Sequence, residues 1–114
     1  MPALRNRREF ERVFNAAPRW HSPLLVLIAK RREQGSSRLG ITLSRRVGGA
    51  VVRNRSKRRI KEILRQTRRL PATDLIVVGK PALARASFQD LRRELQRLIE
   101  RARADQESSA AGSD

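Results

Sequence analysis

The sequence predicts an α+β fold, a two-layer sandwich in which one small mixed sheet packs against three helices. Two observations predict it. Stretches with helical periodicity alternate with short β-rich stretches in the order α-β-β(-β)-α-β-α. The chain has 114 residues, which is enough for one domain with a single modest core.

The N-terminal third predicts one helix followed by strands. In residues 5–15, Phe10, Val13 and Phe14 recur at helical spacing, and Pro18 ends the pattern. An optional short edge strand is expected near residues 19–21. Residues 24–32 are apolar over most of their length and predict a strand.

A second strand is expected over residues 37–44, because apolar and polar residues alternate there. Gly35 lies in the turn at 33–36 that separates it from the strand before. We therefore expect these two strands to pair as an antiparallel hairpin.

A long basic helix is predicted over residues 51–69, after the break at Gly48-Gly49 and before Pro71. The following strand, 74–79, is uniformly apolar and predicts a buried position. The buried stripe of the helix is expected to comprise Ile60, Ile63, Leu64 and Thr67.

A last helix is predicted over residues 87–104, with Ser87 as its N-cap. Residues 1–104 are expected to form a single domain, and 105–114 a disordered acidic tail. The inner face of this helix is expected to comprise Phe88, Leu91, Leu95, Leu98, Ile99 and Ala102.

Charge is the strongest functional signal. The chain has 27 Arg and Lys against 11 Asp and Glu, a net charge of +16. Residues 45–69 alone contain eleven of the basic residues and one acid, Glu62. Such a chain usually binds a polyanion, and a cluster of this density favours nucleic acid over a merely solvated helix face.

Helical geometry sorts these charges into faces. Arg58, Glu62 and Arg65 fall opposite the apolar stripe, together with Arg69. The loop before the helix brings Arg45 and Arg46 near a helix N-terminus, which favours a phosphate. One flank of the helix is expected to carry Asn54, Lys57, Lys61 and Arg68.

The sequence predicts no catalytic residue and no metal site in the protein. It has no Cys, and His21 is the only His. Glu9 and Glu11 point in different directions on a helix, so no convergent carboxylate cluster is apparent. Neither a signal-peptide pattern nor a membrane-length apolar run is present, so we expect a cytoplasmic protein that does not bind membranes.

Three other functions fit the composition. A ribosomal protein would bind RNA without processing it. A DNA-binding regulator would use 51–69 as its recognition helix, although the residues before Gly48 predict a strand where a partner helix is needed. A standalone nuclease would need the carboxylate cluster that the sequence lacks.

Residues 40–62 resemble the signature of the bacterial ribonuclease P protein component. The core of the resemblance is Arg53-Asn54-Arg55, followed by Lys57 and Arg58. The similarity extends to residues 10–14 and to 74–78, in the same order and spacing. The long match is specific, whereas the three-residue core alone would be weak.

The resemblance implies that an RNA subunit is the catalyst and removes the 5′ leader of precursor tRNA. It implies a left-handed βαβ crossover, Mg²⁺ bound chiefly by the RNA subunit, and no requirement for a protein partner. The expected partners are therefore the catalytic RNA subunit and precursor tRNA. Residues expected to bind the RNA subunit are Arg45, Arg46, Arg53, Asn54, Arg55, Lys57, Arg58, Lys61, Arg65 and Arg68.

The resemblance also implies a cleft for the single-stranded leader. From helical spacing alone, Phe10 and Phe14 are expected in the core more often than on a surface where nucleotide bases stack. The resemblance instead favours a partly exposed pair at the cleft wall. The family commonly has an aromatic residue where this chain has Ile28, so charge and apolar contact are expected to matter more here. The expected leader-binding residues are Phe10, Phe14, Ile28, Ser44 and Arg45.

Overall fold

The computed structural model describes residues 1–68 and 70–112, with side chains through residue 107. The order of helices and strands matches the prediction, including the edge strand near residues 19–21. A 3-10 helix, η1, was not predicted and begins at Pro81, which suits the first position of a helix. The elements are α1 (Arg7–Ala16), β1 (Arg19–His21), β2 (Leu25–Arg31), β3 (Arg38–Leu43), α2 (Ala50–Gln66), β4 (Thr73–Gly79), η1 (Pro81–Arg85) and α3 (Phe88–Gly112).

The four strands form one mixed sheet in the order β1-β2-β4-β3. β2 is antiparallel to both β1 and β4, and β3 is parallel to β4. The predicted hairpin between 24–32 and 37–44 is therefore wrong, because β4 lies between these strands. β4 is buried at every residue except the half-buried Val78, which suits an interior position and leaves β3 at the edge.

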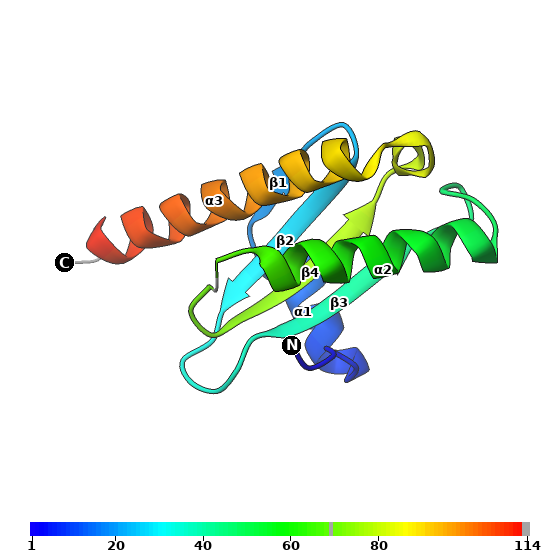
Figure 1. The fold of residues 1–114 in the computed structure, drawn as a ribbon. Coiled ribbons are helices and arrows are strands. Elements are labelled where there is room, and N and C mark those ends of the chain that lie inside the picture. The colour runs from blue at the N-terminus through cyan, green and yellow to red at the C-terminus, as the bar shows by residue number, and fades with distance from the viewer. Residues whose placement is uncertain (69, 113–114) are drawn as a thin grey trace.

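Helices cover both faces of the sheet. Figure 1 shows α2 and α3 on the near face and α1 on the far face. Leu27, Ile60 and Leu95 belong to the larger core under α2 and α3, whereas Ile28 and Ile76 belong to a smaller core under α1. The α+β class is confirmed, but α1 adds a third layer to the predicted two.

β3, α2 and β4 form a crossover between adjacent parallel strands. In Figure 1, α2 lies on the near side of the sheet. When β3 and β4 are turned to point upward, β4 lies to the left of β3, so the connection is left-handed. This is the rare hand for such a unit, and it is the one that the resemblance implied.

α2 ends earlier than predicted, at Gln66 rather than 69. Thr67 takes an extended conformation, and its hydroxyl donates to the Ile63 carbonyl at 2.6 Å. Arg68 consequently lies in the loop after the helix instead of on its flank. Arg69 lies outside the described residues.

α3 begins as predicted and ends later. The Ser87 hydroxyl accepts from the Asp90 amide at 3.1 Å, as expected of an N-cap. The helix runs to Gly112, over part of the segment for which the sequence predicts a disordered tail, and 113–114 lie outside the described residues. One reason is that the Trp20 indole donates to the Asp105 carboxylate at 2.7 Å, which ties this extension to β1. No helix in the described part of the chain has the length and apolar character needed to cross a membrane.

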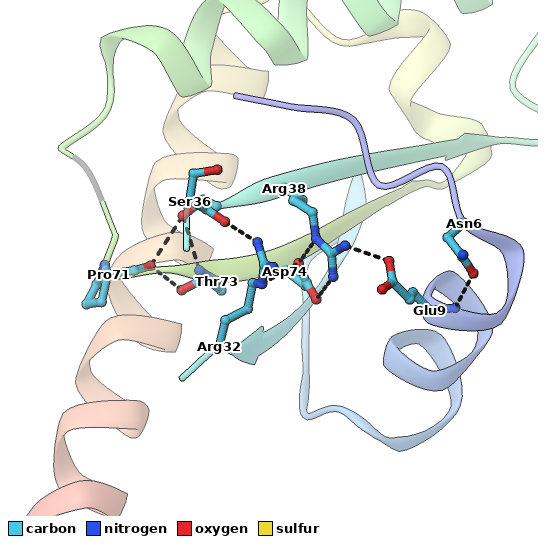
Figure 2. Close-up of polar contacts among 9 residues, drawn as sticks. Asn6, Glu9, Arg32, Ser36, Arg38, Pro71, Thr73 and Asp74 are labelled. Atoms are coloured by element: carbon cyan, nitrogen blue, oxygen red, sulfur yellow. Dashed lines mark hydrogen bonds and ion pairs between the residues drawn. The ribbon is translucent and has the colours of Figure 1, made fainter. Parts of the chain in front are cut away.

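A polar cluster joins α1, β3 and β4 at one end of the sheet, as Figure 2 shows. Arg38 donates through Nε and Nη2 to the two carboxylate oxygens of Asp74, each at 2.8 Å. Its Nη1 donates to Glu9 at 2.5 Å, and Arg32 lies 3.8 Å from Asp74. The hydrogen bonds with Asp74 raise the pKa of Arg38 further above its usual range, so Arg38 stays cationic.

We predict that Asp74→Asn lowers the free energy of unfolding by about 2–4 kcal/mol, because Arg38 loses its bidentate charged partner in a largely buried site and keeps only Glu9. The Asp74 side chain is only 7% exposed. Urea unfolding followed by circular dichroism measures the change. The control is Asp90→Asn, whose exposed pair with Arg93 should contribute no more than about 0.5 kcal/mol. Equal losses in the two variants would contradict the prediction.

Candidate nucleic-acid interface

α2 presents most of the basic side chains of the chain. It buries Ser56, Ile60 and Ile63, and most of its basic side chains lie on the exposed part of its circumference. The α2 surface comprises the predicted set Arg45, Arg46, Arg53, Asn54, Arg55, Lys57, Arg58, Lys61, Arg65 and Arg68, all exposed except the half-buried Arg53. The structure therefore brings all ten predicted residues onto α2 and the loops at its two ends.

The side chains of this surface differ in how firmly they are held. Arg55 donates to the Ala84 carbonyl of η1 at 3.4 Å, and Arg65 pairs with Glu62. Lys57 and Lys61 make no hydrogen bond or ion pair with any described residue. These two ammonium groups, like the side chains of Arg45, Asn54 and Arg58, therefore form no bond that holds the described part of the fold together.

Arg59 was not in the predicted set. It is half-buried and donates to the Ala86 carbonyl at 3.3 Å, so it braces α2 against the residue that follows η1. On the other flank, the Nε of Arg53 is buried and has no hydrogen-bond partner among the described residues. Only the fold shows that η1 lies beside Arg59.

The loop before α2 requires a glycine. Gly48 has φ +153°, and a Cβ at this position would lie 2.9 Å from the Val52 side chain. The turn exposes Arg45 and Arg46 beside the first turn of α2. That turn contains no acidic residue, and its N-cap Gly49 makes no side-chain hydrogen bond. The helix dipole and the backbone amides there favour an anion.

On the opposite face of the sheet, three rows of residues run across the strands. The first row joins Asp74 to Arg38, and the Arg38 side chain reaches α1. The second row runs through Ile28, Ile76 and Gly40, and α1 covers it. The third row is only half-buried or exposed, and consists of His21, Val26, Val78 and Thr42.

The two phenylalanines of α1 lie beside this third row. Phe10 and Phe14 are half-buried and stacked, with ring centroids 6.1 Å apart and an interplanar angle of 15°. They pack on the same apolar cluster as Val26 and Val78. We call Phe10, Phe14, Val26, Thr42 and Val78 the α1–sheet surface. The predicted exposure of the aromatic pair is thus found, with apolar strand residues next to it.

Two contacts shape the aromatic pair. The Arg19 guanidinium lies 4.6 Å from the centroid of the Phe14 ring, and it also donates to the Phe14 carbonyl. A Cβ at Gly40 would lie 2.8 Å from Cε2 of Phe10, so the ring sits on β3 only because residue 40 is glycine. Sequence analysis overlooked both, since each depends on which strand lies under α1.

Ile28 is not part of this surface. Its side chain is 0% exposed under α1, so its predicted contact with a leader is wrong. Val26 and Val78 occupy the open row instead, and Thr42 completes it. The signal for Val26 was available in the sequence, because residues two apart on a strand share a face. Ser44 and Arg45, the other predicted leader residues, are exposed directly after β3.

The described residues do not fit a resident divalent cation. They contain no group of three or more His, Cys, Asp or Glu side chains that could hold one. Asp74 and Glu9 are both bound to Arg38. A DNA-recognition helix is also a poor match for α2, because β3 rather than a helix precedes it.

Comparison with known proteins gives the family. The profile of the family described as Ribonuclease P matches residues 2–103. The chain belongs to the ribonuclease P family. The match includes α1, the whole sheet, α2 and α3 up to residue 103, so membership makes this chain a ribonuclease P protein component, whose partner is an RNA subunit.

Individual relatives agree. The ribonuclease P protein component of Roseiflexus castenholzii is 36% identical over 102 residues, covering 87% of this chain and 84% of that protein. The one from Gluconacetobacter diazotrophicus is also 36% identical, over 103 residues, covering 87% and 89%. Among solved structures, the ribonuclease P protein of Thermotoga maritima has a TM-score of 0.79 at 29% identity, covering 89% of this chain and 97% of that chain.

We predict that Gly40→Ala destabilises the protein by about 1 kcal/mol or more, because the added methyl group collides with the Phe10 ring. In a Phe10→Ala background the collision is absent, and the same change should be neutral or stabilising, since alanine has less unfolded-state entropy than glycine. Denaturant unfolding of the four proteins measures this reversal of sign. A loss of the same size in both backgrounds would show that the ring contact is not the cause.

Proposed function

We propose that this chain binds the catalytic RNA of ribonuclease P through the α2 surface and the 5′ leader of precursor tRNA through the α1–sheet surface. The protein then assists endonucleolytic removal of the leader without an active site of its own. Its contribution is electrostatic and positional, since arginine and lysine lower the repulsion between two RNA molecules. Mg²⁺ for the hydrolysis is held by the RNA, because the protein has no suitable ligand cluster among its described residues.

The observation that carries the proposal is the α2 surface. Ten basic or amide side chains gather on one helix and its end loops, and Glu62 is the one acid among residues 45–68. Residues 88–105 of α3 are balanced by comparison, with five Arg and four acids. A rigid helix with a concentrated cationic face suits the sugar-phosphate backbone of a structured RNA.

The α1–sheet surface supports the second half of the proposal. Half-buried aromatic rings and valines offer stacking and apolar contact to unpaired bases, which tolerates any base sequence. Arg19 and the exposed Arg45 can meet the phosphates of the same strand. The sheet separates this surface from α2, so one protein can hold two RNA segments at once.

For the α2 surface, we predict that the double variant Lys57→Gln, Lys61→Gln weakens binding to the RNA subunit about tenfold at physiological salt. The slope of log affinity against log salt should fall by about 2, because two phosphate contacts and their counterion release are lost. The fold should be unaffected, since neither lysine bonds to another described residue.

The matched control is Arg97→Gln, Arg101→Gln on α3, which removes the same charge from exposed positions outside the α2 surface. Filter binding at several salt concentrations compares the two double variants. Equal weakening in both would mean that overall charge rather than the α2 surface governs binding.

For the α1–sheet surface, we predict that Phe14→Leu lowers the affinity of the assembled enzyme for precursor tRNA about fivefold, because leucine cannot stack on a leader base. Binding of the same substrate without its leader should be unchanged. The control is Phe88→Leu, which makes the same substitution at a half-buried residue of α3. A similar loss for the leaderless substrate would place the effect outside leader binding.

A further inference from the structure

Two consecutive residues of α1 contact two residues on one face of β3. Glu9 accepts a hydrogen bond from Arg38, and Phe10 lies over Gly40. Arg38 and Gly40 are two residues apart on a strand, so both point toward α1. β3 therefore makes two neighbouring contacts with α1, the ion pair of Arg38 with Glu9 and the packing of Gly40 against the Phe10 ring.

We propose that the Glu9–Arg38 ion pair is a positioning device for leader binding. It fixes where α1 sits on the sheet, and so sets the distance between the Phe10–Phe14 pair and the open row of Val26 and Val78. Neither Glu9 nor Arg38 contacts the leader. The inference rests on the proposed function of the α1–sheet surface.

The segment before α1 is bound to β3, because the Leu4 amide donates to the Leu39 carbonyl and the Leu39 amide donates to the Pro2 carbonyl, each at 2.8 Å. These backbone bonds fix where the chain enters the helix, but the first turns of the helix itself have few contacts with the sheet. The helix has ten residues, and Val13, in its second half, is its only buried residue. Leu4 and Ala17, which flank the helix, complete the small core beneath it. Within the first turns of the helix, the cap from Asn6 bonds only to α1 itself, so Glu9 supplies the polar side-chain link from the helix to the sheet.

Arg38 is suited to this role because it is itself immobilised. Two of its nitrogens bond to Asp74 in a bidentate pair, and its side chain is only 21% exposed. The planar guanidinium is thereby held with Nη1 directed at α1, as Figure 2 shows. Arg38 cannot reorient to follow Glu9, because its guanidinium is already fixed by Asp74. The hydrogen bond to Glu9 therefore forms only when α1 lies at one position on the sheet.

Because Glu9 is negatively charged, a positioning role and a purely electrostatic role predict opposite changes in leader affinity when Glu9 is replaced. A carboxylate next to a polyanionic leader repels it, so removing Glu9 should strengthen leader binding if charge alone matters. A positioning role predicts the opposite, because the aromatic pair loses its register on the sheet. The direction of the effect therefore separates the two.

Glu9→Gln tests this with Glu11→Gln as the matched control. Both substitutions remove one carboxylate from α1, but Glu11 pairs only with the exposed Arg7 on the same helix. The measured quantity is the ratio of the dissociation constants of the assembled enzyme for leaderless and full precursor tRNA. We expect Glu9→Gln to lower this ratio roughly fivefold, within the usual range for coupled contacts, and Glu11→Gln to leave it unchanged or slightly higher. An unchanged or raised ratio for Glu9→Gln would overturn the inference.

A double-mutant cycle with Phe10→Leu distinguishes positioning from general loss of stability. If Glu9 acts through the ring, Glu9→Gln should have almost no effect on the ratio once Phe10 is replaced. Full additivity would overturn the inference, as would an equal loss of affinity for the RNA subunit, which α2 contacts on the other side of the sheet. If Phe10→Leu and Phe14→Leu alone leave the ratio unchanged, the proposed leader site itself has failed.

Discussion

The salt bridge between Arg38 and Asp74 holds together one end of the sheet, where β3, β4 and α1 meet. Asp74 is a carboxylate on the interior strand β4, and its burial would be costly without charged partners. Arg38 meets it from β3, and Arg32 approaches from the end of β2. Nearby, Ser37 bonds to Pro71 and Thr73, which closes the same end of the sheet. One carboxylate thus aligns three strands at the point where β3 and β4 begin.

The alignment of β3 and β4 at this end of the sheet determines which helices lie on its two faces. Because β3 and β4 are parallel and adjacent, their connection has to cross one face of the sheet, and α2 crosses the near face, where it buries Ile60 and Ile63. Because Arg38 extends to the far face, it meets α1 through Glu9. The basic helix and the aromatic pair are consequently held by the same strand but on opposite sides of a sheet. This separation lets one small domain carry two independent RNA-binding surfaces in the proposed function.

Much of this arrangement was predictable from local pattern. The helical period around Ile60 identified the buried stripe of α2, and charge counting identified its outward face. Chain order predicted the correct elements, and the resemblance implied the left-handed crossover. The errors were non-local. Helical spacing predicted that α2 continues past Thr67, whereas the helix ends at Gln66. Composition predicted a tail from residue 105, whereas α3 continues to Gly112 and Asp105 bonds to Trp20.

The sequence by itself determined which residues form helices and strands and where the positive charge is concentrated, because both depend on neighbours along the chain. Only the tertiary structure decided that β4 lies between β2 and β3, since strand pairing compares distant partners. It also decided that the Ile28 side chain is buried whereas the Val26 side chain is only half-buried. These two residues share a strand face and an apolar character. They differ only in whether α1 lies above them, and that depends on where β3, through Arg38 and Gly40, holds the helix.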